Sequence, residues 1–257
     1  MFLTSDYHTH TIYSHGKGGV IDNAQRAKEI GLKEIAISDH GFAHPAFGLT
    51  KKKLPKLQND CQKATEQTGV KVLVGIESNI IGTDGTVDLK PALYDKFDVF
   101  LAGIHKLVYF KFSSLFSLGL PDLFCSTLKM DKVSKSLIKT NTKTFINVIK
   151  NNPVDVITHL NFCCFADPVE VAKVAADYGT YLELNSKKVH LQDEELYKVL
   201  ETGVKFVISS DAHSPDRVGE ISLVEKLLER VKIPEDRIMN INGKLPQFRF
   251  KAFKERG

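Results

Sequence analysis

The sequence predicts an α/β fold built on a parallel sheet, and three features of the 257-residue chain support this prediction. Short apolar runs alternate with helix-like stretches from one end to the other, which is the rhythm of repeated strand–helix units. The apolar runs are rich in Val, Ile, Leu and Phe at successive positions, as in parallel strands buried on both faces. No linker or low-complexity segment interrupts the alternation. The length suits one large domain as well as two small ones.

Seven apolar runs are the candidate strands. They comprise residues 3–8, 34–39, 71–76, 98–104, 154–158, 180–185 and 204–210. A strand–helix unit repeated seven times can close into a barrel or open into a doubly wound sheet. The period of the sequence does not distinguish these two arrangements.

Helices are expected between the strands, and several have recognisable ends. Asp22 caps a run that ends at Gly31, and Asp167 opens a run that ends at Gly179. Glycine just past a helix end adopts a left-handed conformation that other residues avoid, so it marks the end of a helix. The remaining helices are expected at residues 53–68, 131–151, 192–203 and 220–230.

Two segments depart from the alternation. Residues 107–129 are unusually rich in Phe, Leu and Ser and follow the fourth strand, on the side where barrel loops build active sites. They are expected to form either a lid or substrate wall, or a peripheral helix or contact of a homo-oligomer. Residues 246–257 have no clear period, so a docked or frayed tail is expected after a main body of about residues 1–245.

Composition and charge exclude several classes of protein. Lys and Arg number 35 against 31 Asp and Glu, and this excess of +4 suits an anionic substrate without marking a nucleic-acid surface. The longest apolar run is five residues, 162–166, far short of the roughly 18 that cross a bilayer. The sequence shows no secretory signal, and its four cysteines have no framework spacing. We therefore expect a cytoplasmic protein with reduced thiols and no membrane partner.

Histidines and carboxylates stand at the ends of almost all the candidate strands. His8 and His10 are two residues apart on the first strand, so their side chains share a face and can hold one metal ion. Asp211 and His213 repeat this spacing after the last strand. The carboxyl ends of parallel strands meet on one rim, where these residues are expected to converge. The other members of the set are His40, Glu77, His105, His159 and, in the loop after the first strand, His15.

These nine potential ligands are too many for a single ion. A zinc ion with an open catalytic position takes three or four protein ligands, so the set predicts two or three ions. A carboxylate has two oxygens and can bridge two ions. We assign this role to Glu77 because of its central place in the series.

The order of these motifs resembles the PHP family, named for polymerase and histidinol phosphatase. The resemblance rests on Asp6-x-His8-x-His10-Thr11, Ser38-Asp39-His40-Gly41, Gly75-Ile76-Glu77, Gly103-Ile104-His105, Thr158-His159 and Ser210-Asp211-Ala212-His213. It covers essentially the whole chain, which implies a single domain over residues 1–257 with a distorted seven-stranded (β/α)7 TIM-like barrel. It also implies a site of three divalent metal ions, zinc, manganese or iron, that hydrolyses phosphate esters. The chain looks closest to the stand-alone bacterial phosphatases of the family.

The resemblance also assigns the ligands to three ions. It gives His8, His10, Glu77 and Asp211 to the first, Glu77, His105 and His159 to the second, and His15, His40 and His213 to the third. His15 departs from the pattern of many members, which have Asp at this position of the Tyr-Ser-x-Gly motif. Either residue type can bind a metal ion.

The leading hypothesis is a phosphatase that hydrolyses phosphate monoesters of small metabolites through a metal-activated hydroxide, with histidinol phosphate as one candidate substrate. Two ions roughly 3.5 to 4 Å apart stabilise the charge of a phosphate dianion and provide a nucleophile ionised near neutral pH. One alternative is a 3′ to 5′ exonuclease or other phosphodiesterase, although no long basic stripe favours nucleic acid. The other is a non-catalytic metal-binding module, although several ions at an open rim are not typical of a structural site.

Catalysis is expected to depend on Glu77 and Asp211 at the ions and on a cation that holds the phosphate. Arg217, four residues after His213, is the candidate because a guanidinium can bind two phosphate oxygens at once. The alternative is a surface ion pair between Arg217 and Glu220. Weaker phosphate-binding candidates are Lys17 and Lys106.

Five further polar residues lie near the predicted ligands or in the loops between the strands. Asp6 and Asp39 neighbour ligand histidines and are expected either to orient them by accepting hydrogen bonds or to stabilise the turns that follow the strands. Asn185 ends the sixth strand and is expected to line the pocket. His44 and His190 do not stand at strand ends, so we interpret them as ordinary loop residues.

Overall fold

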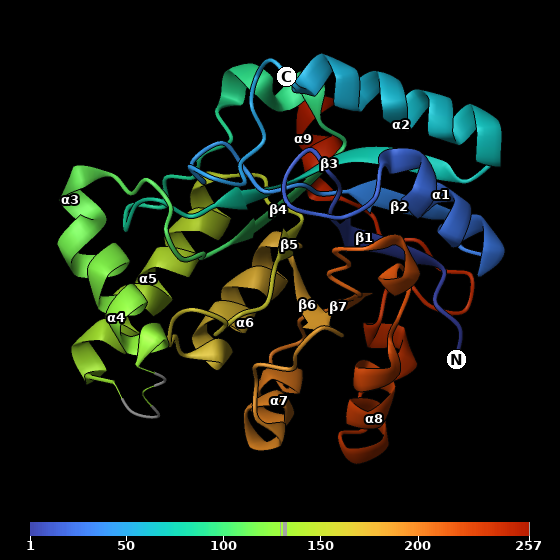
Figure 1. The fold of residues 1–257 in the computed structure, drawn as a ribbon. Helices are drawn as coiled ribbons and strands as arrows, with labels where there is room; N and C mark the ends of the chain where they lie inside the picture. The colour runs from blue at the N-terminus through green and yellow to red at the C-terminus, as the bar shows by residue number, and fades with distance from the viewer. Residues whose placement is uncertain (129, 131–132, 257) are drawn as a thin grey trace.

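The computed structural model describes residues 1–128, 130 and 133–256, and there the chain forms a barrel of parallel strands surrounded by helices (Figure 1). The strands are β1 (Ser5–Thr9), β2 (Glu34–Ile37), β3 (Lys71–Asn79), β4 (Val99–Gly103), β5 (Val156–Ile157), β6 (Tyr181–Asn185) and β7 (Phe206–Ser209). Each of them overlaps a run predicted from the sequence. The main difference is β3, which continues past residue 76 because Glu77 to Asn79 pair with β4. Glu77 therefore lies within a strand and not after it.

The longer helices lie close to their predicted positions. They are α1 (Val20–Glu29), α2 (Leu54–Thr68), α5 (Lys135–Asn151), α6 (Pro168–Tyr178), α7 (Asp193–Leu200) and α8 (Ser222–Arg230). Asp167 caps α6 and Gly179 ends it in the left-handed conformation, as predicted. Asp22 caps α1 from within its first turn: its carboxylate accepts a hydrogen bond from the amide of the N-cap residue Gly19 at 2.7 Å, so the helix begins before Asp22 and not after it. The predicted start of α5 at residue 131 lies outside the described residues.

The strands follow one another around the barrel in chain order, from β1 to β7, and every neighbouring pair is parallel. Hydrogen bonds just beyond the end of β7 join the last strand to the first. The His10 amide donates to the Ala212 carbonyl at 2.8 Å, and the Ala212 amide donates to the His8 carbonyl at 3.3 Å. The sheet is therefore a nearly closed seven-stranded barrel, as the family resemblance implied, and not an open doubly wound sheet.

Side chains that alternate along the strands build two apolar layers. On β4, Val99 and Leu101 point into the barrel, where they pack with Tyr7 and other inward residues. Phe100 and Ala102 belong to the larger cluster between the sheet and the helices. Burial on both faces explains why the strands are apolar at successive positions. This rigid frame fixes the directions of the side chains at the strand ends.

The C-terminal tail is docked. Its helix α9 (Arg249–Lys254) buries Phe250 completely, and the Phe250 amide donates to Asp155 Oδ1 at 2.8 Å. Just before the helix, Phe248 packs edge-on against Tyr7 of the barrel interior, with ring centroids 4.8 Å apart. Of the two states expected for this tail, the structure shows the docked one through residue 256.

The segment after β4 is helical. It forms α3 (Phe112–Ser114), a π-helical turn at Leu115–Gly119, and α4 (Leu120–Thr127), and residue 129 lies outside the described part. These turns project at the left edge of the barrel in Figure 1. Among the described residues, no helix is long and apolar enough to cross a membrane.

Candidate metal centre

The structure brings the nine sequence-predicted ligands together at the carboxyl end of the barrel. Eight of them form groups of three whose ligand atoms lie within 4.8 Å of one another. These groups are His10 with His40 and His213, His8 with His159 and Asp211, His8 with His10 and Glu77, and His40 with Glu77 and His105. The ninth, His15, stacks on His40 with ring centroids 4.9 Å apart and lies 4.3 Å from the His213 ring.

Glu77 lies at the centre of the cluster and is fully buried. Its carboxylate is 2.7 Å from His159 Nε2, 2.8 Å from His40 Nδ1 and 2.9 Å from His105 Nε2. His8 Nε2 at 3.3 Å and His10 Nε2 at 3.6 Å complete the surroundings. Five imidazoles from four strands or strand ends, those of β1, β2, β4 and β5, thus face one carboxylate, which has two oxygens to share between metal ions.

Asp211 is the second acidic member of the cluster. One of its oxygens lies 3.4 Å from His10 Nε2, 3.3 Å from His213 Nδ1 and 3.8 Å from His8 Nε2. Asp211 is at the end of β7 and the histidines come from β1 and from its own turn. The closure of the barrel between β1 and β7 therefore creates this half of the site.

Several buried polar atoms of the cluster make no hydrogen bond to the described residues. They are His8 Nε2, His10 Nε2, His40 Nδ1 and Glu77 Oε2, all of which face the centre of the cluster. Buried polar atoms are normally paired, and leaving them unpaired is costly. A divalent cation would satisfy these nitrogen and oxygen donors together, so the residues fit a metal site.

The electrostatics of Glu77 and His10 favour the protonation states that bind metal, whereas at His8 the effect of burial is outweighed by the facing carboxylates of Glu77 and Glu183, which raise its pKa well above the usual value. Burial opposes ionisation of Glu77, but the facing imidazoles of His105 and His8 outweigh it and hold the pKa of this carboxyl well below its usual value. Burial lowers the pKa of His10 well below its usual value, and the neighbouring His40 lowers it further. A carboxylate and a neutral imidazole are the forms in which these side chains coordinate a cation.

Two of the five non-glycine residues with a positive φ in the described part of the chain are proposed ligands. His159 has a φ of 28° and Asp211 a φ of 50°, in the left-handed region that side chains other than glycine rarely occupy. Such conformations cost on the order of 1–3 kcal/mol each and cluster at functional sites. Both side chains face the cluster, with His159 Nε2 2.7 Å from Glu77 and Asp211 Oδ1 3.4 Å from His10 Nε2.

Glu183 is a buried carboxylate of the site that the sequence interpretation missed. Its Oε1 lies 2.6 Å from His8 Nδ1, and its Oε2 accepts hydrogen bonds from the His159 amide at 2.7 Å and from Asn185 Nδ2 at 3.0 Å. Glu183 and Asn185 are two residues apart on β6 and so share the inward face. That alternation of polar residues in an otherwise apolar strand was the available signal.

Glu183→Gln is expected to lower metal affinity and kcat/KM by roughly 10- to 100-fold, as for other groups that orient a ligand imidazole. The substitution removes the charge that holds His8 Nδ1, while its size is kept. Titration of the metal-free protein with Zn²⁺ or Mn²⁺ measures the affinity. Wild-type affinity in the variant would show that Glu183 only stabilises the fold.

The interpretation of Asp6 and Asp39 as partners of ligand imidazoles is wrong. Asp39 accepts hydrogen bonds from the Thr11 amide at 2.8 Å and from the Thr11 hydroxyl at 2.7 Å. Asp6 accepts from the Ser210 amide at 3.2 Å and the Gly219 amide at 2.9 Å. Both carboxylates tie loops to the end of the barrel, and they position the ligands through the backbone.

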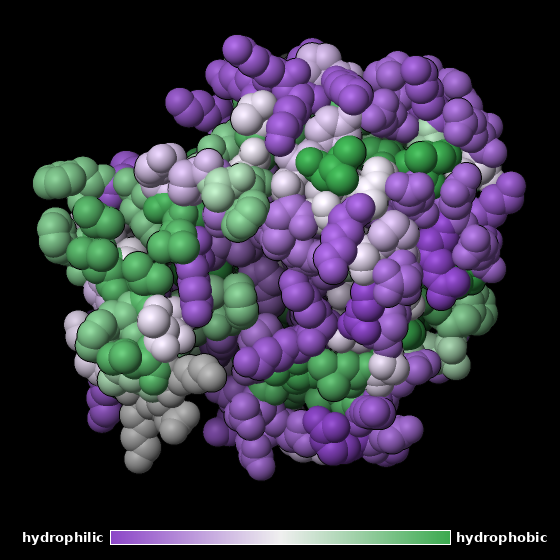
Figure 2. Space-filling model, viewed as in Figure 1, coloured by the Kyte–Doolittle hydropathy of each residue, from purple (hydrophilic) through white to green (hydrophobic). Residues whose placement is uncertain are grey.

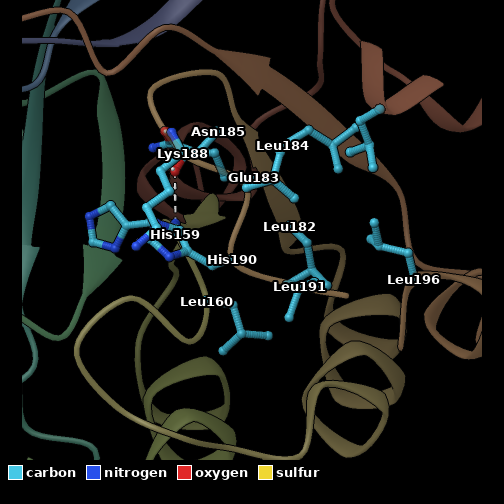
Figure 3. Close-up of a pocket in the computed structure, with 12 residues that line it drawn as sticks. His159, Leu160, Leu182, Glu183, Leu184, Asn185, Lys188, His190, Leu191 and Leu196 are labelled. Carbon is cyan, nitrogen blue, oxygen red and sulfur yellow. Dashed lines mark hydrogen bonds between the residues drawn. The ribbon is translucent and has the colours of Figure 1, made fainter. Parts of the chain in front are cut away.

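A cavity of about 230 Å³ opens onto the cluster. Beside the proposed ligands it is lined by Phe162, Asn185, Lys187, Lys188 and His190. Figure 3 shows Lys188 and His190 beside His159, with the leucines of the adjoining pocket on the other side. Asn185 lines the cavity as predicted, and His190 lies in a loop, as interpreted, but its side chain also lines the cavity.

Two lysines are the cationic side chains that line this cavity in the described part of the chain. Lys187 Nζ lies 3.2 Å from His213 Nδ1 and 3.4 Å from Asp211 Oδ1. Asn185 Oδ1 accepts hydrogen bonds from the amides of Lys187 at 2.9 Å and Lys188 at 3.2 Å, which fixes the turn that carries them. The sequence interpretation did not select either lysine.

The three cations that the sequence interpretation did select lie elsewhere. Arg217 is 44% exposed and pairs with Glu220 at 2.8 Å, the alternative considered for it, and it does not line the cavity. Lys17 is exposed. Lys106 lines a neighbouring cavity, which His105 also lines. A phosphate-binding role for Arg217 stays a prediction.

Comparison with known proteins gives consistent matches. The family model described as PHP domain matches residues 6–224. A probable phosphatase of Thermoanaerobacter sp. is 30% identical over 267 residues, covering 96% of this chain and 95% of its own. A probable phosphatase of Escherichia fergusonii is 28% identical over 252 residues, with 92% and 89% covered.

A solved structure has the same fold. The crystal structure of histidinol phosphate phosphatase from Lactococcus lactis, complexed with zinc, L-histidinol and phosphate, aligns with a TM-score of 0.60 at 15% identity. The alignment covers 91% of this chain and 95% of that one. At this identity the similarity shows that the two chains share the barrel fold and shows nothing about the substrate or the metal ligands of this chain.

Proposed function

The chain belongs to the PHP domain family, and we propose that it is a metal-dependent phosphatase that hydrolyses phosphate monoesters of small metabolites. The observation that carries the proposal is the cluster around Glu77, where five imidazoles face one buried carboxylate at the floor of an open cavity. A structural metal site closes its coordination, whereas this one faces a space that a ligand can enter.

The donor set supports three divalent ions, zinc, manganese or iron. His8, His10, Glu77 and Asp211 would hold one ion, and Glu77, His105 and His159 would hold a second. His15, His40 and His213 would hold the third, because their rings lie within 4.9 Å of a neighbour in this group. When bound, such ions stabilise the charge on phosphate oxygens and lower the pKa of a water molecule toward neutrality.

The other lining residues suit a small anionic substrate. Lys187 and Lys188 add positive charge at the side of the cavity, where they can bind the phosphate oxygens that face away from the metal ligands. Phe162 and His190, with ring centroids 5.3 Å apart, form a wall against which the organic part of the ester can pack. Asn185 holds the lysine turn in place and also donates to Asp211 at 3.2 Å.

The size of the cavity favours a metabolite over a nucleic acid. Its 230 Å³ is below the roughly 300–1,000 Å³ of typical ligand pockets, and a nucleic acid would need a longer basic groove. A non-catalytic module is the third possibility, and the open cavity with its lysines weighs against it.

The test is a panel of substrates given to the metal-loaded protein, with metal content measured. Small phosphate monoesters, including histidinol phosphate, are compared with a phosphodiester and a single-stranded oligonucleotide. Turnover of monoesters alone supports the proposal. Preferential cleavage of the diester or oligonucleotide would identify a phosphodiesterase, and full metal occupancy without any turnover would identify a non-catalytic module.

Lys187→Ala is expected to raise KM for a monoester roughly tenfold, with metal content unchanged, because a hydrogen bond to a charged group contributes about 1.5–3 kcal/mol. Arg217→Ala is the matched comparison. The sequence-based prediction is that this substitution raises KM or lowers kcat/KM for monoesters more than for diesters. Since Arg217 pairs with Glu220, we expect the smaller effect from Arg217→Ala. Steady-state kinetics of both variants on one monoester and one diester measure which substitution has the larger effect on KM. Unchanged KM in Lys187→Ala would leave phosphate binding to the metals or Arg217.

A further inference from the structure

The helical segment after β4 presents a row of large apolar side chains to solvent. The row, here called the apolar ridge, has one member every four residues: Phe112, Phe116, Leu120, Phe124 and Leu128. Each is between 45% and 83% exposed. Figure 2 shows hydrophobic residues gathered at this side of the molecule, over α3 and α4. Residues four apart are neighbours on a helix surface, and the wider π-helical turn at Leu115–Gly119 reduces the rotation from one member to the next, so the ridge is one continuous feature.

The ridge is held in a fixed position by the other side of the same helices. Leu118 and Cys125 are buried there. Asp122 is also buried and accepts a hydrogen bond from Asn141 Nδ2 of α5 at 2.9 Å. At the start of α3, the Lys111 ammonium pairs with Asp84 at 2.6 Å. The segment is thus anchored to the barrel, and its exposed apolar side is not needed for that anchoring.

The area of the ridge is large for a surface that stays in water. Aromatic side chains bury roughly 150–250 Å² each, so the ridge exposes on the order of 600 Å². Leu107 and Tyr109, 65% and 70% exposed, extend the apolar surface of this segment. Together they reach roughly the 800 Å² that one partner contributes to a standard protein interface. The largest apolar patch on a typical monomer is about 300–600 Å².

We propose that the apolar ridge is the contact surface of a symmetric homodimer of this chain. The ridge is symmetric about Leu120, with two members on either side at equal spacing. In a two-fold contact between antiparallel helices, Leu120 meets Leu120 of the other copy, and Phe116 meets Phe124. An isologous contact requires this self-complementarity, in which residue i meets j and j meets i. Rows of residues four apart are also the ridges that interdigitate in the commonest helix packing.

The charges on the segment favour a second copy over a lipid surface. Helices that lie on anionic membranes carry Lys and Arg beside their apolar side. The described residues from 112 to 128 include no Lys or Arg, and their one acid, Asp122, is buried. Two such surfaces can meet without bringing like charges together, whereas a charged partner would find nothing complementary on the ridge.

The test is the mass of the full-length, metal-loaded protein across a dilution series, measured by light scattering and sedimentation. The wild type is expected at about twice 28.7 kDa, and Phe116→Glu is expected to be a monomer, because each dimer would bury two new carboxylates. Phe2→Glu is the matched control, since Phe2 is 60% exposed at the N-terminus, and it should stay dimeric. Thermal unfolding confirms that both variants are folded.

A disulfide test separates a two-fold contact from other contacts. All four native cysteines are buried. Leu120→Cys should therefore form a disulfide-linked dimer on mild oxidation, because the axis brings the two copies of this position within bridging distance. Phe2→Cys should not. A wild type that is monomeric at every concentration, or one that instead sediments with vesicles of anionic lipid, would overturn the proposal. So would a Phe116→Glu variant that remains dimeric.

Discussion

Glu77→Gln is expected to reduce kcat/KM for a phosphate monoester about a thousandfold or more. Metal ions stabilise the charge of the transition state by several kcal/mol, and each 1.36 kcal/mol lost lowers the rate about tenfold. Glu77 faces five imidazoles, with nitrogens between 2.7 and 3.6 Å from its oxygens. A neutral amide has almost the same shape but would leave the two ions that Glu77 would bridge short of its negative charge. The loss should appear mainly in kcat when metal is saturating.

The matched comparison is His15→Ala, at the exposed edge of the cluster. His15 is not among the close groups of ligand atoms, and a single missing imidazole leaves the Glu77 carboxylate in place. We expect a clearly smaller loss for this variant, and the same ranking against His40→Ala and His213→Ala. Kinetics at saturating metal, with bound metal measured for each protein, make the comparison. An equal loss in His15→Ala would contradict the central role of Glu77.

The convergence of the cluster could be predicted from the sequence because one local pattern recurs on several strands. His40, His105 and His159 each follow a short apolar run, and parallel strands end on one rim. In the structure these three imidazoles lie 2.7–2.9 Å from the same carboxylate. A repeated one-dimensional signal therefore predicts a three-dimensional cluster, even though the exact ends of the strands, such as that of β3, were misjudged.

The residues that the sequence interpretation missed depend on contacts that no period encodes. Lys187 reaches the cavity because the side chain of Asn185 fixes the turn that follows β6. His190 lies further along the same loop. Glu183 was visible only as a polar residue two positions before Asn185, a weak signal beside the apolar run around it. Arg217 was favoured for its distance along the chain from His213, which does not determine where a loop side chain points.

Closure of the barrel is likewise a long-range property. The bonds that join β1 to β7 link residues about 200 positions apart, as between Asp6 and Ser210 or His10 and Ala212. Strand periodicity predicted the parallel sheet but left an open sheet as an alternative. The family resemblance selected the barrel. The site depends on the closure of the barrel, because Asp211 meets His8 and His10 only when the first and last strands are neighbours.

Removal of metal with a chelator is expected to abolish phosphatase activity and to lower the midpoint of thermal unfolding by about 5–10 °C. A ligand that binds only the folded chain adds about 2.7 kcal/mol at a hundredfold excess over its Kd, and each kcal/mol shifts Tm by about 2–4 °C in a chain of this size. The physical source is the set of buried, unpaired atoms around Glu77, which no protein group satisfies in the described structure. Re-addition of Zn²⁺ or Mn²⁺ should restore both properties.

Calorimetry of two variants distinguishes metal binding at the cluster from non-specific effects of metal on stability. Glu77→Gln should lose most of the metal-dependent shift in Tm, while Arg217→Ala should keep it. Equal midpoints with and without metal in the wild type would mean that the cluster binds too weakly to hold its ions.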